Sequence, residues 1–190
     1  MKLLATIISL SVLCSVSAQW ERPKIQTLDS KLSQNTKCLN PEYLLFSARK
    51  MGNQKPALLF YLHGGGGVGD DVLRLQGQAR ALLEGIEKFK KGPCHVVVPQ
   101  CSRTRRAGGR GTWEASDLDL LLKGLSSTLD FDSRRIYLTG NSMGGYGSWM
   151  WGGNSPHHFA AIAPVVGGIG PGGPKDVTPE LDQWAVNLAK

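Results

Sequence analysis

The chain has 190 residues, a formal net charge of +7 and 41% hydrophobic residues. This length is enough for one domain with a hydrophobic core. No linker, repeat or low-complexity segment marks a second domain, and no repeating basic-aromatic pattern indicates a nucleic-acid-binding module.

The first residues have the pattern of an export signal. Met1-Lys2 gives a positive start, residues 3 to 13 are mostly apolar, and Val16-Ser17-Ala18 fits a small-residue cleavage site. The apolar run is shorter than the ~20 residues that a membrane-spanning helix needs. We therefore predict a signal peptide over residues 1–18, a single domain over residues 19–190, and a secreted or periplasmic location. Removing Lys2 with the signal lowers the net charge from +7 to +6.

Much of the positive charge lies in one segment, "SRTRRAGGRG", residues 102 to 111. Basic loops can bind nucleic acid or acidic polymers. The simpler interpretation is a solvated surface loop, and no nucleic-acid partner is expected.

Three cysteines follow the predicted signal: Cys38, Cys94 and Cys101. Cys94 and Cys101 flank an apparent strand, and seven extended steps separate them by ~20 Å, which excludes a disulfide between them. Cys38 remains a candidate partner for either. No spacing resembles a zinc site, and neither metal nor cofactor is expected.

Strands and helices alternate along the chain. Apolar runs predict strands at residues 42–49, 57–64, 95–100, 135–140 and 160–168. Helical spacing of apolar residues predicts helices at residues 72–86, 118–129, 143–153 and 178–190. The last helix is predicted to have Thr178 as its N-cap and Pro179 in its first position. This order is typical of a mainly parallel sheet covered by helices on both faces. Ligands bind at the carboxyl ends of the strands in such sheets. The chemistry is therefore expected around residues 63–69, 100–113, 140–144 and 167–175.

The segment "LLFYLHGGGGVGDD" allows two interpretations. Gly64-x-Gly66-x-x-Gly69 fits a dinucleotide fingerprint, whereas His63-Gly64-Gly65-Gly66 fits the loop that binds an oxyanion in esterases. A dinucleotide site needs a residue that contacts the ribose ~20 positions after the glycines. Glu84 stands at that distance in the middle of a predicted helix, and Arg103 is 39 residues beyond Gly64. The esterase interpretation is therefore favoured.

A second motif, Gly140-Asn141-Ser142-Met143-Gly144, follows an apolar strand and begins a helix. This is the context of a nucleophile elbow, in which the glycines leave room for a tight turn that raises the serine. Ser142 is the predicted nucleophile. The predicted oxyanion hole combines the N–H of Met143 with that of Gly64 or Gly65. The alternative is a helix-capping serine in a glycine-rich turn.

The segments "LLFYLHGGGG", "VVVPQC", "TWEASDLDLLL" and "DSRRIYLTGNSMGGYGSW" resemble secreted α/β-hydrolases of the esterase and prolyl-oligopeptidase-like group, near the polyhydroxybutyrate-depolymerase-like and the feruloyl or acetylxylan esterases. The resemblance covers roughly residues 40 to 190. It implies a three-layer α/β-hydrolase fold with a mostly parallel sheet. It also implies hydrolysis of an ester, or less readily a peptide bond, through an acyl-enzyme on Ser142, with a small-molecule or polymer-borne ester as substrate.

The catalytic histidine of such hydrolases follows the serine in the chain. Only His157 and His158 do so here, and the intervening helix carries them to the opposite edge of the sheet. His95 begins its strand and is equally remote. His63 is expected to orient the oxyanion loop rather than to act as the base.

The catalytic acid is not identified either. Asp176, Glu180 and Asp182 precede the strand that carries the acid in related proteins. We therefore expect a chain that is C-terminally incomplete, representing the N-terminal two-thirds of the fold, and inactive alone. The alternative is a non-catalytic protein of hydrolase fold that binds a ligand or partner. Trp113, Tyr146 and Trp149 are equally candidates for the core and for substrate contacts.

Overall fold

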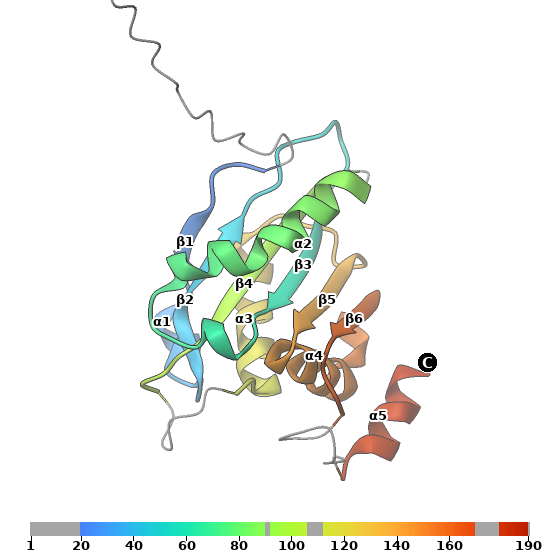
Figure 1. Cartoon of the computed structure of the whole chain (residues 1–190). Coiled ribbons are helices and arrows are strands. Elements are labelled where there is room, and N and C mark those ends of the chain that lie inside the picture. The colour runs from blue at the N-terminus through green and yellow to red at the C-terminus, as the bar shows by residue number, and fades with distance from the viewer. Residues whose placement is uncertain (1–19, 90–91, 106–111, 170–178, 190) are drawn as a thin grey trace, which may run out of the picture.

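The structure, a computed structural model, describes residues 20–89, 92–105, 112–169 and 179–189. A six-stranded sheet lies at its centre, with helices on both faces (Figure 1). This is the layered α/β architecture that the alternation of strands and helices predicts.

The sheet has the order β1-β2-β4-β3-β5-β6. Its strands are β1 (Lys24–Thr27), β2 (Leu39–Phe46), β3 (Ala57–Leu62), β4 (Cys94–Cys101), β5 (Ile136–Asn141) and β6 (Ala161–Val165). The four strands from β4 to β6 run parallel, whereas β1 and β2 are antiparallel to their neighbours. The sheet is therefore mixed, and its parallel half contains the strands that precede both predicted motifs.

The longer helices form the outer layers. They are α2 (Leu75–Phe89), α3 (Ala115–Thr128), α4 (Met143–Asn154) and α5 (Leu181–Leu188); the short elements are α1 (Ser30–Ser33), η1 (Gly65–Gly67), η2 (Val72–Arg74) and η3 (Pro156–His158). Helix α2 covers one face of the sheet, α3 and α4 cover the other, and α5 packs on α4 (Figure 1). Within the described residues, no helix has both the length and the apolar character needed to cross a bilayer.

The side chains of β3 point alternately to the two faces of the sheet, and both sets are apolar, so helices must cover both faces. Leu58, Phe60 and Leu62 belong to the core beneath α3 and α4, whereas Leu59 and Tyr61 belong to the core beneath α2. Because successive side chains of a strand point to opposite faces, a continuously apolar strand must be buried on both. The run "ALLFYL" therefore places β3 in the middle of the sheet.

Some predicted boundaries are wrong. Strand β1 and helix α1 were not predicted, because β1 is largely exposed and shows no apolar pattern. Strand β2 begins at Leu39, three residues before its predicted start. Pro179 does not occupy the first position of the last helix. That helix begins at Leu181, where the Trp184 N–H first closes a helical bond to the Glu180 carbonyl (2.9 Å), and Thr178 lies outside the described residues.

The basic segment is not wholly a solvated loop. The Arg105 guanidinium donates hydrogen bonds to the Ser33 carbonyl (3.0 Å), the Leu39 carbonyl (2.9 Å) and the Thr36 hydroxyl (2.5 Å). Arg105 therefore fastens the segment after β4 to α1 and the start of β2. Residues 106–111 lie outside the described part of the chain.

Candidate active site at the carboxyl edge of the sheet

Ser142 forms the turn between β5 and α4. Its backbone has φ 55° and ψ −116°, which non-glycine residues rarely adopt, and its side chain is exposed. The Ser142 N–H donates to the Val165 carbonyl (2.9 Å), and the Ser142 carbonyl accepts from the N–H groups of Gly145 (2.8 Å) and Tyr146 (3.1 Å). Such strain costs on the order of 1–3 kcal/mol and persists only when the surroundings impose it.

Two glycines impose this turn. A Cβ on Gly140 would lie 2.3 Å from the Gly144 carbonyl oxygen, and a Cβ on Gly144 would lie 1.8 Å from the Leu62 carbonyl oxygen. Backbone atoms of β3, β5 and α4 therefore meet where any side chain would collide. The sequence prediction that these glycines leave room for the turn is confirmed by these distances.

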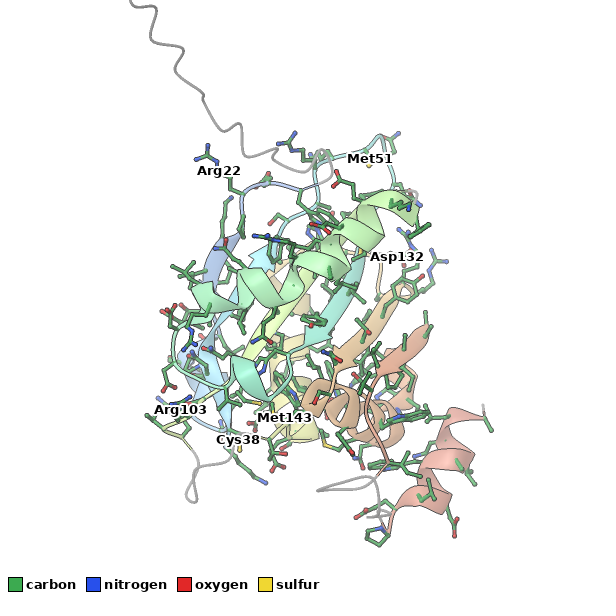
Figure 2. The ribbon with its side chains drawn as sticks, in the orientation of Figure 1. Arg22, Cys38, Met51, Arg103, Asp132 and Met143 are labelled. Carbon is green, nitrogen blue, oxygen red and sulfur yellow. The ribbon has the colours of Figure 1, made fainter. Side chains whose placement is uncertain are left out.

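The glycine loop after β3 lies beside Ser142. A Cβ on Gly64 would be 3.2 Å from the Asn141 carbonyl oxygen and 3.6 Å from the Ser142 Cβ. Gly65 begins η1 and Met143 begins α4, so the N–H of each lies at the start of a helical turn, where no intrahelical acceptor exists. Figure 2 shows Met143 at the same end of the sheet as Cys38 and Arg103, away from Asp132 and Met51.

His63 supports this loop from within. The Cys101 N–H donates to Nε2 (3.0 Å), so Nδ1 carries the proton and donates to the Gly64 carbonyl (2.6 Å). Burial lowers the pKa of His63 from 6.5 to about 4, although the bond to Gly64 partly opposes that shift. Both ring nitrogens are occupied and the ring is neutral, so His63 orients the loop and is not positioned as a base.

The space around the His63 ring is filled on both sides. The Trp113 ring packs against it, with centroids 4.8 Å apart, and a Cβ on Gly67 would lie 2.4 Å from its Cγ. Trp113 is therefore a core residue behind the loop. Tyr146 and Trp149 are half-buried.

Gln100, which the sequence analysis did not single out, also fixes the loop. Its Nε2 donates to the carbonyls of Gly67 and Asp71 (both 3.0 Å), and its Oε1 accepts from Asn40 Nδ2 (2.9 Å). Gln100 is 1% exposed, and a buried amide with partners at both ends has one fixed orientation. Its sequence signal was a polar residue at the carboxyl end of a buried strand.

Ser142 itself has no base among the described residues. No group in the described ranges hydrogen-bonds its Oγ, and all four histidines of the chain are described. His95 is bonded through Nδ1 to the Ala48 N–H (3.1 Å) and through Nε2 to the Asp130 carbonyl (3.2 Å). His158 pairs with Asp119 (3.2 Å).

The positions of these histidines agree with the predicted sheet edges. His157 and His158 lie in η3, which precedes β6, and β6 begins opposite Tyr137 near the start of β5. They are therefore at the amino edge of the parallel strands, whereas Ser142 is at the carboxyl edge. His95 is the second residue of β4 and is likewise at the amino edge.

The acidic candidates lie on or beside α5. Glu180 is its N-cap residue and Asp182 is in its first turn, while Asp176 lies outside the described residues. Helix α5 packs against α4 through Trp184 and through a bond from Asn187 Nδ2 to the Gly153 carbonyl (2.8 Å). Gly153 is near the end of α4 that is remote from Ser142. In the described ranges, no cluster of three or more His, Cys, Asp or Glu side chains has the geometry to hold a metal ion.

The fold agrees with that of solved esterases. The chain is similar to a thermostable esterase (TM-score 0.61, 24% identity, covering 92% of this chain and 52% of that one) and to a ferulic acid esterase (0.59, 18%, 90% and 67%). It is also similar to an acetyl xylan esterase from Aspergillus awamori (0.53, 16%, 75% and 50%). No family model and no curated protein matches the chain. At these identities the likeness establishes the fold: the chain has the α/β-hydrolase fold of esterases.

The chain spans only part of these similar structures. It covers about half the length of the thermostable esterase and of the acetyl xylan esterase, and about two-thirds of the ferulic acid esterase.

Proposed function

We propose that this chain carries the nucleophile and oxyanion hole of a serine hydrolase that cleaves an ester through an acyl-enzyme on Ser142. The observation that carries the proposal is the exposed Ser142 with its strained backbone beside the glycine loop. The Cβ of Ser142 lies 3.6 Å from the position that a Cβ on Gly64 would take. The oxyanion donors are the Met143 N–H and the N–H of Gly64 or Gly65. Donors aimed at a developing negative oxygen are a large contribution to acyl-transfer catalysis.

The proposed reaction has two steps. Ser142 Oγ attacks the carbonyl carbon while a base removes its proton, and the carbonyl oxygen becomes the anion that the two N–H groups bind. The alcohol leaves with a proton when the tetrahedral intermediate collapses to the acyl-serine. Water then attacks the acyl carbon and releases the acid and the free serine.

The proposed base is not one of the four histidines of this chain, because none hydrogen-bonds Ser142 and three lie at the opposite sheet edge. We propose that the acid and the base are supplied by residues outside this sequence, and that the 190-residue chain is a poor hydrolase alone. Its substrate is proposed to be a small-molecule or polymer-borne ester, which the esterase neighbours support. The signal pattern over residues 1–18 supports a secreted or periplasmic location.

A second candidate is a non-catalytic binding protein of hydrolase fold. The observation that favours it is the same lack of a base at Ser142 within the described residues. The two candidates differ in one property: a hydrolase site should respond when a base is supplied, whereas a binding site should not.

Imidazole is the base to supply. Purified chain is mixed with p-nitrophenyl acetate at increasing imidazole, and the rate of Ser142→Ala is subtracted as background. We expect a low initial rate, well under the ~1 s⁻¹ of an ordinary intact enzyme, and a Ser142-dependent rate that rises with imidazole. Ser127→Ala, which changes an exposed serine on α3, should behave as the unmodified chain. Equal rates for Ser142→Ala and the unmodified chain at every imidazole concentration would support the binding protein.

A further inference from the structure

A second residue at this edge has an unusual backbone. Val166 directly follows β6, its φ is 50°, and the residue is 79% exposed. Among the described residues, Ser142 and Val166 are the two non-glycine residues with positive φ. A β-branched residue in this conformation is an outlier, whereas Asn or Gly adopts it readily.

The two strained residues occupy adjacent positions. Asn141 and Val165 are paired in the register of β5 and β6, so Ser142 and Val166 are the next residue on each strand. The Ser142 N–H donates to the Val165 carbonyl (2.9 Å). Each strand is therefore followed directly by a residue with positive φ, at the same level of the sheet.

The neighbours of Val166 hold it there. A Cβ on Gly167 would lie 2.3 Å from the Gly145 carbonyl carbon, so the residue after Val166 is pressed against the first turn of α4. This contact fixes where the chain leaves β6. It does not require valine at position 166, because the side chain points largely into solvent. Residues with strained backbones cluster at functional sites, and this strain in a valine lies directly beside Ser142.

Val166 and the glycine loop lie on opposite sides of Ser142. Strand β5 has β3 on one side and β6 on the other. The loop after β3 carries the proposed oxyanion donors, so the carbonyl oxygen of a bound ester would point toward β3. The acyl chain is bonded to the carbonyl carbon of the ester and stays bonded to it through both steps of the reaction. The exposed isopropyl group of Val166, which follows β6, offers an apolar surface on the side of Ser142 that the carbonyl oxygen does not occupy.

We propose that Val166 is a specificity-determining residue whose side chain contacts the acyl group of an ester bound at Ser142 and favours apolar acyl chains. This inference rests on the proposed function of Ser142. It adds a substrate class, esters of apolar carboxylic acids.

The test compares p-nitrophenyl hexanoate with p-nitrophenyl acetate in the imidazole assay, counting only the Ser142-dependent rate. One buried methylene is worth about fourfold, so Val166→Asn should lower the hexanoate-to-acetate ratio about fourfold to fifteenfold. Leu73→Asn is the matched control, because Leu73 is an exposed apolar residue (50%) of η2 on the α2 side of the sheet. The control should leave the ratio unchanged.

Thermal unfolding separates a role in specificity from a role in folding. Because Asn tolerates the left-handed conformation, Val166→Asn should keep or raise the Tm by ~2 °C while the ratio falls. If Val166→Asn retains Ser142-dependent activity but leaves the hexanoate-to-acetate ratio unchanged, this inference is overturned and the proposed function of Ser142 is not. A Tm that falls by several degrees with the ratio would also overturn it, since Val166 would then support the fold. No Ser142-dependent rate at all would overturn both the proposed function and this inference.

Discussion

Replacing Gly144 with alanine tests the contact that raises Ser142. The added Cβ would lie 1.8 Å from the Leu62 carbonyl oxygen, 2.5 Å from the Leu62 carbonyl carbon and 2.9 Å from the His63 carbonyl oxygen. All three are backbone atoms at the end of a central strand, so no side chain can rotate away. Ordinary contact begins near 3.4 Å, which requires α4 or the end of β3 to move by more than an ångström.

The expected loss is at the upper end of overpacking effects, about 3 kcal/mol. For a domain of this size 1 kcal/mol corresponds to ~2–4 °C, so Gly144→Ala should lower the Tm by ~6–12 °C. Gly85→Ala is the matched control, because Gly85 is also inside a helix and a Cβ there meets nothing within 4 Å. It should raise stability by ~0.5–1 kcal/mol.

Gly144→Ala and Gly85→Ala together separate the effect of steric contact on stability from the effect of helix propensity. Propensity alone predicts that alanine stabilises both helices, whereas the structure predicts opposite signs. Thermal unfolding followed by circular dichroism measures both. A Gly144→Ala protein that melts within 2 °C of the unmodified chain would refute the close packing of β3 against α4.

Three further predictions concern the glycine loop. Because burial lowers the pKa of His63 from 6.5 to about 4, the unfolded chain binds a proton between those values that the folded chain does not accept, and this group should lower stability by up to roughly 3 kcal/mol as pH decreases from 6.5 to 4. Urea unfolding at pH 7.5 and 5 measures the fall. His63→Gln should reduce the fall without abolishing it, because burial also lowers the pKa of His95 and of His158. Gln100→Leu leaves the Gly67 and Asp71 carbonyls and the Asn40 side-chain amide without these hydrogen bonds. It should lower the free energy of unfolding in urea by about 3 kcal/mol and speed hydrogen exchange of the amides in the loop. Unchanged exchange would show that Gln100 does not fix the loop. Gly65→Leu keeps the backbone N–H and adds a side chain whose Cβ meets no other atom within 4 Å, so its Tm should stay within ~2 °C. Because the loop lies beside Ser142, the added side chain should obstruct the space that the ester oxygen occupies and lower the Ser142-dependent rate ~10²-fold. An unchanged rate would show that Gly65 does not border that space.

The position of the candidate site could be predicted because it depends on local patterns and one general rule. The runs "ALLFYL" and "RIYLTG" are apolar strands, and each ends in a glycine motif. Parallel strands bring their carboxyl ends to one edge, so Gly64 and Ser142, 78 residues apart in the chain, were expected to meet. The role of His63 followed from its place in the same loop.

Other features depend on tertiary contacts that leave no pattern. Gln100 bonds to residues 29, 33 and 60 positions away in the chain, and a single polar residue near the end of a strand does not reveal such partners. Strand β1 is exposed and polar, so it is held by pairing with β2 rather than by an apolar pattern. The left-handed backbone of Val166 contradicts the preference of valine, and only the path of the chain past Gly145 imposes it.

The most direct test of the central claim is labelling of the 190-residue chain by a fluorophosphonate, with the modified residue identified by mass spectrometry. A serine with oxyanion donors but no base should react slowly, over hours at pH 8, and faster with imidazole. We predict one principal adduct, on Ser142, that is lost in Ser142→Ala and reduced in Gly65→Leu. Labelling that persists in Ser142→Ala, or a chain that stays unmodified at Ser142 with imidazole present, would contradict the proposal that this edge of the sheet is an acyl-transfer site.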